Sequence, residues 1–402
     1  MSLSPSLFRF GAFAVAYFLS FFFRSANAVI AADLRQEVGL GPAELGFMTG
    51  LFFAAYAGVQ LPVGVALDRY GPQRVTPALM MLAALGSLIF STGDSFATLA
   101  LGRALIGVGM AGVLTGALKA FGQWYTAREY TAASGSLVGI GAAGGLMSAT
   151  PLVWLNHAIG WRAVFAWAGL VVAVSAGSIF ILIPRLRKWE ARVDAIKSPG
   201  GMRGLFSSLE FWRIALLAAV MTGTVFAFQG LWAGPYLADV AGFSNIQVGN
   251  IVLLLSSGIV VGYSLSGFLS ARLGLGRVVV VATSLFALVQ MALALTPPRD
   301  AIPVLFALFG ITGAFNIMLL AQARLAFPVE MTGRAVTAVN LFAIGGTFFL
   351  QWGIGLVVGR FAHAGHLPPQ AYMAVLLATT VLTVAALLWY LPLSRRAVFE
   401  RG

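Results

Sequence analysis

The chain has 402 residues, of which 59% are hydrophobic and only 9% are charged. Soluble domains carry about 25% charged residues, so these proportions exclude a soluble fold of this size. Cysteine is absent, and the three His and 13 acidic residues are scattered, so we expect no disulfide, no metal site and no bound cofactor. In a soluble protein, the net charge of +12 would suggest a nucleic-acid partner. Here the basic residues lie mainly between apolar segments, which indicates cytoplasmic loops and no nucleic-acid partner.

Apolar segments of membrane-spanning length follow one another along the chain, since a span needs about 20 mainly apolar residues. The first half has candidates near 8–32, 44–67, 75–93, 96–122, 129–156 and 162–183. After a polar stretch, six more lie near 211–239, 245–271, 276–296, 301–326, 332–361 and 370–391. We predict an all-α membrane protein with twelve transmembrane helices, in an N-terminal bundle (1–183) and a C-terminal bundle (211–402) joined by a cytoplasmic linker (184–210).

The distribution of Lys and Arg predicts the orientation. With the N-terminus inside, most of the 25 basic residues fall on the cytoplasmic side, and Arg35, Arg162, Arg299 and Arg360 remain outside. No small-residue cleavage site precedes Arg24, so we interpret the first segment as a retained span. We predict a monomeric, multi-pass protein of the bacterial inner membrane, in contact with the lipid bilayer and with both termini cytoplasmic.

The two halves of the chain repeat one another. The run from Gly64 to Arg74 returns 203 residues later as the run from Gly267 to Arg277, and the same offset relates Gly46 to Gly249. Internal repeats of apolar helices are typical of secondary transporters.

The stretch between the second and third spans carries a family signature. The superfamily hallmark is Gly-x3-Asp-Arg-x-Gly-Arg-Lys/Arg, and this chain has Gly64, Asp68, Arg69, Gly71 and a displaced Arg74. Together with the run from Arg103 to Gly109 and the run from Gly160 to Phe165, it resembles the major facilitator superfamily. The resemblance implies two six-helix bundles that work by alternating access around a central substrate site.

The same stretch is expected to form a cytoplasmic gate that comprises Gly64, Asp68, Arg69, Gly71 and Arg74. Asp68 lies at a helix end close in sequence to Arg69 and Arg74, and it can also face the positive N-terminal end of the helix that begins near Gly333. The second copy has Ala271 in place of Asp68, so only the first half has the full set of charges.

Two arginines are predicted to lie inside the membrane, where a charge costs about 2.5–3.5 kcal/mol on insertion scales and usually has a function. Arg24 lies roughly 20 Å along its helix from Gly11, at 1.5 Å per residue. Organic-anion members of the superfamily place an Arg in span 1, so the resemblance implies that Arg24 binds a carboxylate. Alternatively, Arg24 extends outward to the membrane surface or pairs with Asp33. Arg103 in span 4 is either a second cationic site or a structural residue bonded to carbonyl groups of a neighbouring helix.

Neutral side chains complete the set of substrate candidates. Gln229 and Trp232 lie on one face of span 7, where the neighbouring Gly234 and Pro235 are expected to loosen the helix. The further neutral candidates are Asn27, Tyr56, Gln60, Asn316 and Asn340. In a span, such residues join helices about as often as they bind ligands.

No acidic residue is predicted deep in a span, which leaves the coupling ion open. Asp33, at the outer end of span 1, is the candidate for proton coupling, and the proton can also travel on a substrate carboxylate. We predict a transporter, not an enzyme, that takes up a small organic anion (a carboxylate) by proton symport. A drug or metabolite exporter working by proton antiport is the alternative, although span 5 lacks the Pro of exporter signatures. A membrane sensor that does not transport is a further alternative.

Overall fold

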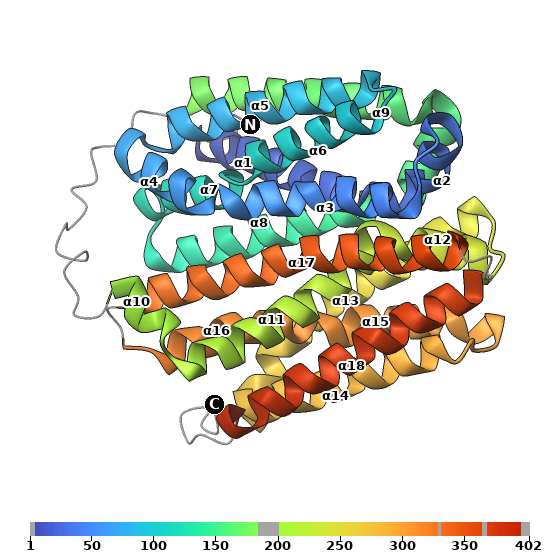
Figure 1. Ribbon diagram of the computed structural model, residues 1–402. Helices are drawn as coiled ribbons and strands as arrows, with labels where there is room; N and C mark the ends of the chain where they lie inside the picture. Colours follow the sequence, from blue (N-terminus) through green and yellow to red (C-terminus); the bar gives the residue numbers. More distant parts are fainter. Residues whose placement is uncertain (1–4, 184–200, 329–330, 364–367, 395–402) are drawn as a thin grey trace. The chain divides into compact units, whose positions relative to one another are not determined.

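Helices form every regular element of the residues that the computed structural model describes, which are 5–183, 201–328, 331–363 and 368–394 (Figure 1). The chain divides into two compact units. Unit 1 comprises Met1–Leu40 and Phe47–Ala191, and unit 2 comprises Gly41–Gly46 and Arg192–Gly402.

The helices of the first half include two bent pairs. In chain order they are α1 (Pro5–Ser25), α2 (Asn27–Val38), α3 (Pro42–Gly58), α4 (Gln60–Tyr70), α5 (Pro72–Thr92), α6 (Phe96–Met110), α7 (Val113–Trp124), α8 (Ala127–Met147) and α9 (Thr150–Leu182). The chain bends by 51° between α1 and α2 and by 44° between α3 and α4. Each bent pair has the length and composition of one membrane span.

The second half contains a span that departs from α-helical geometry. Its elements are α10 (Gly201–Phe206), α11 (Leu209–Ala227), η2 (Phe228–Trp232), α12 (Ala233–Pro235), η3 (Tyr236–Val240), α13 (Asn245–Leu273), α14 (Leu275–Ala294), η4 (Arg299–Ala301), α15 (Ile302–Gly313), η5 (Ala314–Asn316), α16 (Ile317–Ala326), α17 (Thr332–His363) and α18 (Pro368–Ser394). The elements η2 and η3 are π-helical turns on either side of Gly234 and Pro235. The local loosening expected from these two residues is thus present, because Pro235 has no N–H to continue the α-helical bonds.

The predicted twelve-helix membrane fold agrees with the structure. In the described part of the chain, nine helices are long and apolar enough to span a membrane, or up to eleven if each bent pair is one span. The shorter apolar stretch Ala132–Met147 in α8 corresponds to the remaining predicted span. The break predicted between the fifth and sixth spans is present at Gly160, where φ is +76°. The predicted fifth span contains a further break, between Met147, where α8 ends, and Thr150, where α9 begins.

Close approaches of backbones hold the helices of unit 1 together. α5 packs against α6 and α9, while α1 packs against α8 and α9. A Cβ atom on Gly144 of α8 would overlap the carbonyl oxygen of Phe18 in α1, whereas a Cβ atom on Gly139 would meet nothing within 4 Å. Small residues at such contacts let helices approach closely in lipid.

These two glycines of α8 provide a matched test of the packing. We expect Gly144→Ala to destabilise the folded protein by about 1–3 kcal/mol, the range for overpacked sites, because α1 must move away. Gly139→Ala should leave stability unchanged within error. Thermal unfolding of the purified protein in detergent measures both variants, and equal melting temperatures would contradict the close contact between α1 and α8.

Candidate functional site

Arg24 lies in the interior of unit 1, in the last turn of α1, and only 7% of its surface is exposed. Its guanidinium carbon is 4.6 Å from the ring centroid of Phe21 and 5.6 Å from that of Tyr56 in α3. A guanidinium held against aromatic rings at a buried site is little screened by water, which strengthens its attraction for an anion. The surroundings of Arg24 therefore suit an anion.

Arg103 of α6 is fully buried and bonds to the helix that carries Arg24. Its Nη1 donates to the carbonyl oxygen of Phe23 at 2.7 Å, and its guanidinium carbon lies 5.2 Å from the ring centroid of Phe52 in α3. This is the carbonyl contact that one of the two interpretations of Arg103 anticipates. The Nε and Nη2 atoms of Arg103 have no hydrogen-bond partner among the described residues. Arg103 thus fixes the backbone beside Arg24 and retains unused donors.

Asn27 fixes the chain on the other side of the bend. This residue opens α2, is fully buried, and donates from Nδ2 to Thr49 Oγ1 in α3 at 2.8 Å. Thr49 and Phe52 are three residues apart on one face of α3, so the contacts of Asn27 and Arg103 hold successive turns of the bent pair against the same helix. Arg24 lies between these two contacts in the sequence.

Aromatic side chains support the arginine pair. Tyr56 is 5% exposed and stacks on Phe52 with a centroid distance of 6.1 Å, so one pair of rings contacts both guanidinium groups. On the side of α5 and α9, Phe165 packs against Phe23 at 5.7 Å and against Phe90 at 4.5 Å. Gln60, the first residue of α4, is half-buried and makes no hydrogen bond with the described residues.

Two acidic residues one turn apart attach α2 to α9. Asp33 Oδ2 accepts from Asn156 Nδ2 at 2.7 Å. Glu37 Oε2 accepts from Trp161 Nε1 at 3.0 Å and lies 3.5 Å from Arg162 Nε. The candidate proton-coupling residue Asp33 is therefore one of two carboxylates that hold α2 on α9.

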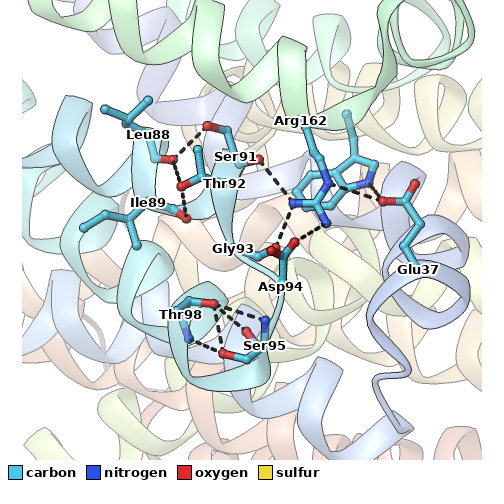
Figure 2. A network of polar contacts seen from close by, with 11 residues as sticks. Glu37, Leu88, Ile89, Ser91, Thr92, Gly93, Asp94, Ser95, Thr98 and Arg162 are labelled. Atoms are coloured by element: carbon cyan, nitrogen blue, oxygen red, sulfur yellow. Dashed lines mark hydrogen bonds and ion pairs between the residues drawn. The ribbon is translucent and has the colours of Figure 1, made fainter.

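Figure 2 shows that Arg162 also joins these helices to the end of α5. Its Nη1 donates to the Gly93 carbonyl at 2.7 Å and to the Ser91 carbonyl at 3.3 Å, and its Nη2 lies 3.1 Å from Asp94 Oδ1. A cation at a helix C-terminus satisfies carbonyl groups that have no intrahelical partner. The run Gly160-Trp161-Arg162 stands out in the sequence as part of the family resemblance, but its contact with Glu37 is not foreseen there.

The predicted gate residues lie at the end of α4 and the turn after it. Asp68 forms an ion pair with Lys119 of α7, and Lys119 Nζ also donates to the Leu67 carbonyl at 2.8 Å. The guanidinium of Arg69 instead lies 5.3 Å from the ring centroid of Tyr70. Gly71, at φ +79°, makes the turn between α4 and α5. A Cβ atom on Gly64 would meet nothing within 4 Å, and the exposed Arg74 makes no ion pair with the described residues.

Two of the candidates of unit 2, Gln229 and Trp232, lie in the first π-helical turn. Gln229 Nε2 donates to Ser256 Oγ at 3.1 Å, and Trp232 Nε1 donates to the Gln351 carbonyl at 3.0 Å. Both amide atoms of the buried Gln351 side chain lack a partner among the described residues. Asn316 is buried in η5, while the half-buried Asn340 of α17 makes no hydrogen bond with the part of the chain that the structure describes.

Comparison with known proteins identifies the family and the fold. The family model described as Major Facilitator Superfamily matches residues 13–350. A bacterial homolog of the human lysosomal transporter Spinster, solved in an inward-facing and occupied conformation, aligns with a TM-score of 0.80 at 19% identity, over 100% of this chain and 99% of that chain.

Curated relatives share part of the sequence. A probable sulfoacetate transporter of Cupriavidus necator is 25% identical over 65% of this chain and 64% of its own length. A probable L-galactonate transporter of Escherichia coli is 27% identical over 55% of this chain and 50% of its own length. A quinolone resistance transporter of Acinetobacter baumannii is 24% identical over 59% of this chain and 60% of its own length. The chain spans less than two-thirds of the length of each of these relatives, all of which are transporters and not enzymes.

The ion pair between Asp68 and Lys119 can be tested by exchanging its charges. We expect Asp68→Asn and Lys119→Gln each to change the transport rate, because the pair joins α4 to α7 at the predicted gate. Substrate binding should survive, and Asp68→Asn should change stability by less than about 1 kcal/mol, since 65% of the Asp68 side chain is exposed and ion pairs of exposed groups contribute little.

The double variant Asp68→Lys with Lys119→Asp is the control, because it restores an ion pair of reversed polarity. Transport into proteoliposomes measures the rate and thermal shift measures binding. If the transport rate of the double variant is no closer to that of the unaltered protein than the rates of the single variants are, a role for this pair in gating is contradicted.

Proposed function

The chain belongs to the Major Facilitator Superfamily, and we propose that it is a transporter that takes up a small organic anion through a carboxylate bound by Arg24. The observation that carries this proposal is the guanidinium of Arg24, held in the interior of unit 1 against the rings of Phe21 and Tyr56. Relatives named for sulfoacetate and L-galactonate support the substrate class, because both compounds are organic acids.

In this proposal the two buried arginines have different roles. Arg24 binds the substrate, and a planar guanidinium can donate two parallel hydrogen bonds to one carboxylate. Arg103 holds the Phe23 carbonyl and so positions the residue that follows it in α1. Its guanidinium also adds positive charge to the interior of unit 1, which favours an anion further.

The transport cycle is proposed to follow alternating access with proton symport. The proton enters either on Asp33 or on the substrate carboxylate. Asp33 is half-buried and bonded to Asn156, so a change in its protonation would alter the contact between α2 and α9. Because α2 continues from the helix that carries Arg24, such a change would reach the substrate site through the bend at Ala26.

Drug export is the second candidate function, and the quinolone resistance relative favours it. A pump for lipophilic cations would place a carboxylate near its substrate, whereas the interior of unit 1 presents Arg24 and Arg103. A membrane sensor would bind a ligand that stabilises the protein but would not transport this ligand across the membrane. A thermal-shift screen over carboxylates, sugar acids, siderophores and cationic dyes separates these classes.

Replacement of Arg24 tests the substrate assignment. We expect Arg24→Ala to weaken binding of the stabilising carboxylate about 10- to 100-fold, the loss of one or two hydrogen bonds to a charged group. Arg24→Lys should recover little, because an ammonium does not reproduce the planar contact. Thermal shift with increasing ligand concentration measures the affinity.

Arg35→Ala is the matched control for this experiment, since Arg35 is exposed on the continuation of the same span. It should bind like the unaltered protein. Unchanged affinity in Arg24→Ala would contradict the carboxylate site, and stabilisation by lipophilic cations alone would favour export.

Coupling to protons is tested with Asp33→Asn. Substrate entry into proteoliposomes should be accompanied by proton entry, measured with a pH-sensitive dye inside the vesicles. If Asp33 carries the proton, Asp33→Asn should lose net proton-driven uptake and keep the exchange of labelled for unlabelled substrate. If proton entry persists in this variant, the proton travels on the substrate. If the unaltered protein shows no proton entry during uptake, proton symport is ruled out.

A further inference from the structure

A groove of about 350 Å³ lies between α1 and α9 in unit 1, away from the arginine pair. Its lining includes Phe8, Gly11 and Val15 of α1 and Val171, Val174 and Leu182 of α9. Phe8 and Val174 are 53% and 62% exposed, and a Cβ atom on Gly11 would meet nothing within 4 Å. The missing side chain of Gly11 therefore leaves part of the space.

The groove offers its occupant no free hydroxyl donor. Ser175 Oγ donates to the Ala12 carbonyl at 3.0 Å, and Ser178 Oγ donates to the Val174 carbonyl at 2.9 Å. The remaining walls are carbon atoms of apolar side chains. Since a polar ligand would lose hydrogen bonds to water without replacement, the groove suits a hydrocarbon chain.

The length of the groove corresponds to one leaflet of a bilayer. At 1.5 Å per residue, the lining runs about 10 Å along α1, from Phe8 to Val15, and about 16 Å along α9, from Val171 to Leu182. Half of a hydrocarbon core of about 30 Å is the depth that one acyl chain occupies.

A cationic side chain lies at the end of the groove nearest the N-terminus. Arg9 follows Phe8, and its Nε donates to the carbonyl oxygen of Leu182 at 3.1 Å. Its guanidinium carbon is 5.7 Å from the ring centroid of Trp124. The two terminal nitrogen atoms make no hydrogen bond or ion pair with residues that the structure describes, so they can donate to a phosphate group.

We propose that this groove binds one anionic phospholipid, with an acyl chain between α1 and α9 and the phosphate of its headgroup on Arg9. In the proposed orientation this end faces the cytoplasmic leaflet, where anionic lipids are attracted by basic residues. The bound lipid holds α1, whose last turn carries Arg24, against α9, which holds α2. The site requires no transported substrate and is therefore independent of the proposed function.

Native mass spectrometry of the delipidated protein, after incubation with phosphatidylglycerol or phosphatidylcholine, tests the site. The unaltered protein should retain one phosphatidylglycerol molecule in preference to phosphatidylcholine. Arg9→Gln should reduce this preference about fivefold, which corresponds to about 1 kcal/mol for one basic residue near an anionic headgroup. Phosphatidylglycerol should also raise the melting temperature of the unaltered protein.

Gly11→Leu fills the groove, and Gly177→Leu is the matched control, because Gly177 lies on α9 outside the groove and its Cβ atom would also meet nothing within 4 Å. We expect Gly11→Leu to lose the retained lipid and Gly177→Leu to keep it. Val15→Phe, which narrows the groove from the same helix as Gly11, should behave like Gly11→Leu. Equal retention in the two leucine variants, or no preference for phosphatidylglycerol in the unaltered protein, would overturn the proposal.

Discussion

The hydrogen bond from Arg103 to the Phe23 carbonyl is the contact on which the geometry of unit 1 depends. α1 ends two residues after Phe23, and the last carbonyl groups of a helix lack intrahelical partners. A buried carbonyl of this kind needs a donor, and a buried guanidinium needs acceptors, so each reduces the cost of burying the other. The bond also fixes the direction in which the chain leaves α1, and hence the position of Arg24.

The two ends of the bent pair are held by different chemistry. Before the bend, in α1, the buried guanidinium of Arg103 bonds to the buried Phe23 carbonyl. After the bend, α2 is attached to α9 through Asp33 and Glu37, whose carboxylates water can reach. The first span of unit 2 is held by uncharged donors, from Gln229 to Ser256 and from Trp232 to the Gln351 carbonyl, and it contains two π-helical turns. The π-helical turns place Gln229 and Trp232 where backbone geometry is least regular, a location common for functional residues.

Features encoded locally in the sequence were predictable, and contacts between distant segments were not. Apolar length identifies the spans, and the position of Arg24 within one of them indicates its burial. Pro235 likewise predicts the irregular helix around it. The partner of Asp68, however, is Lys119, which lies 51 residues away, and helical periodicity indicates which face a side chain occupies but not which helix it meets. The pairing of Glu37 with Trp161 escaped prediction for the same reason. The break at Gly160 falls between the predicted fifth and sixth spans, whereas the break between α8 and α9 lies inside a continuous apolar run and was not predicted.

The exposure of Asp68 has a consequence for the conditions under which the protein works. About 65% of its side chain is accessible to water, so its attraction to Lys119 is weakened by dissolved ions, whose screening length is about 8 Å at physiological ionic strength. The bond between Arg103 and Phe23 is fully buried and is nearly insensitive to salt. Osmotic stress that concentrates the ions around the α4–α7 end would therefore loosen the ion pair there while the interior around Arg24 kept its geometry. The molecule thus separates a part that responds to the ionic composition of its surroundings from a part that is shielded from it.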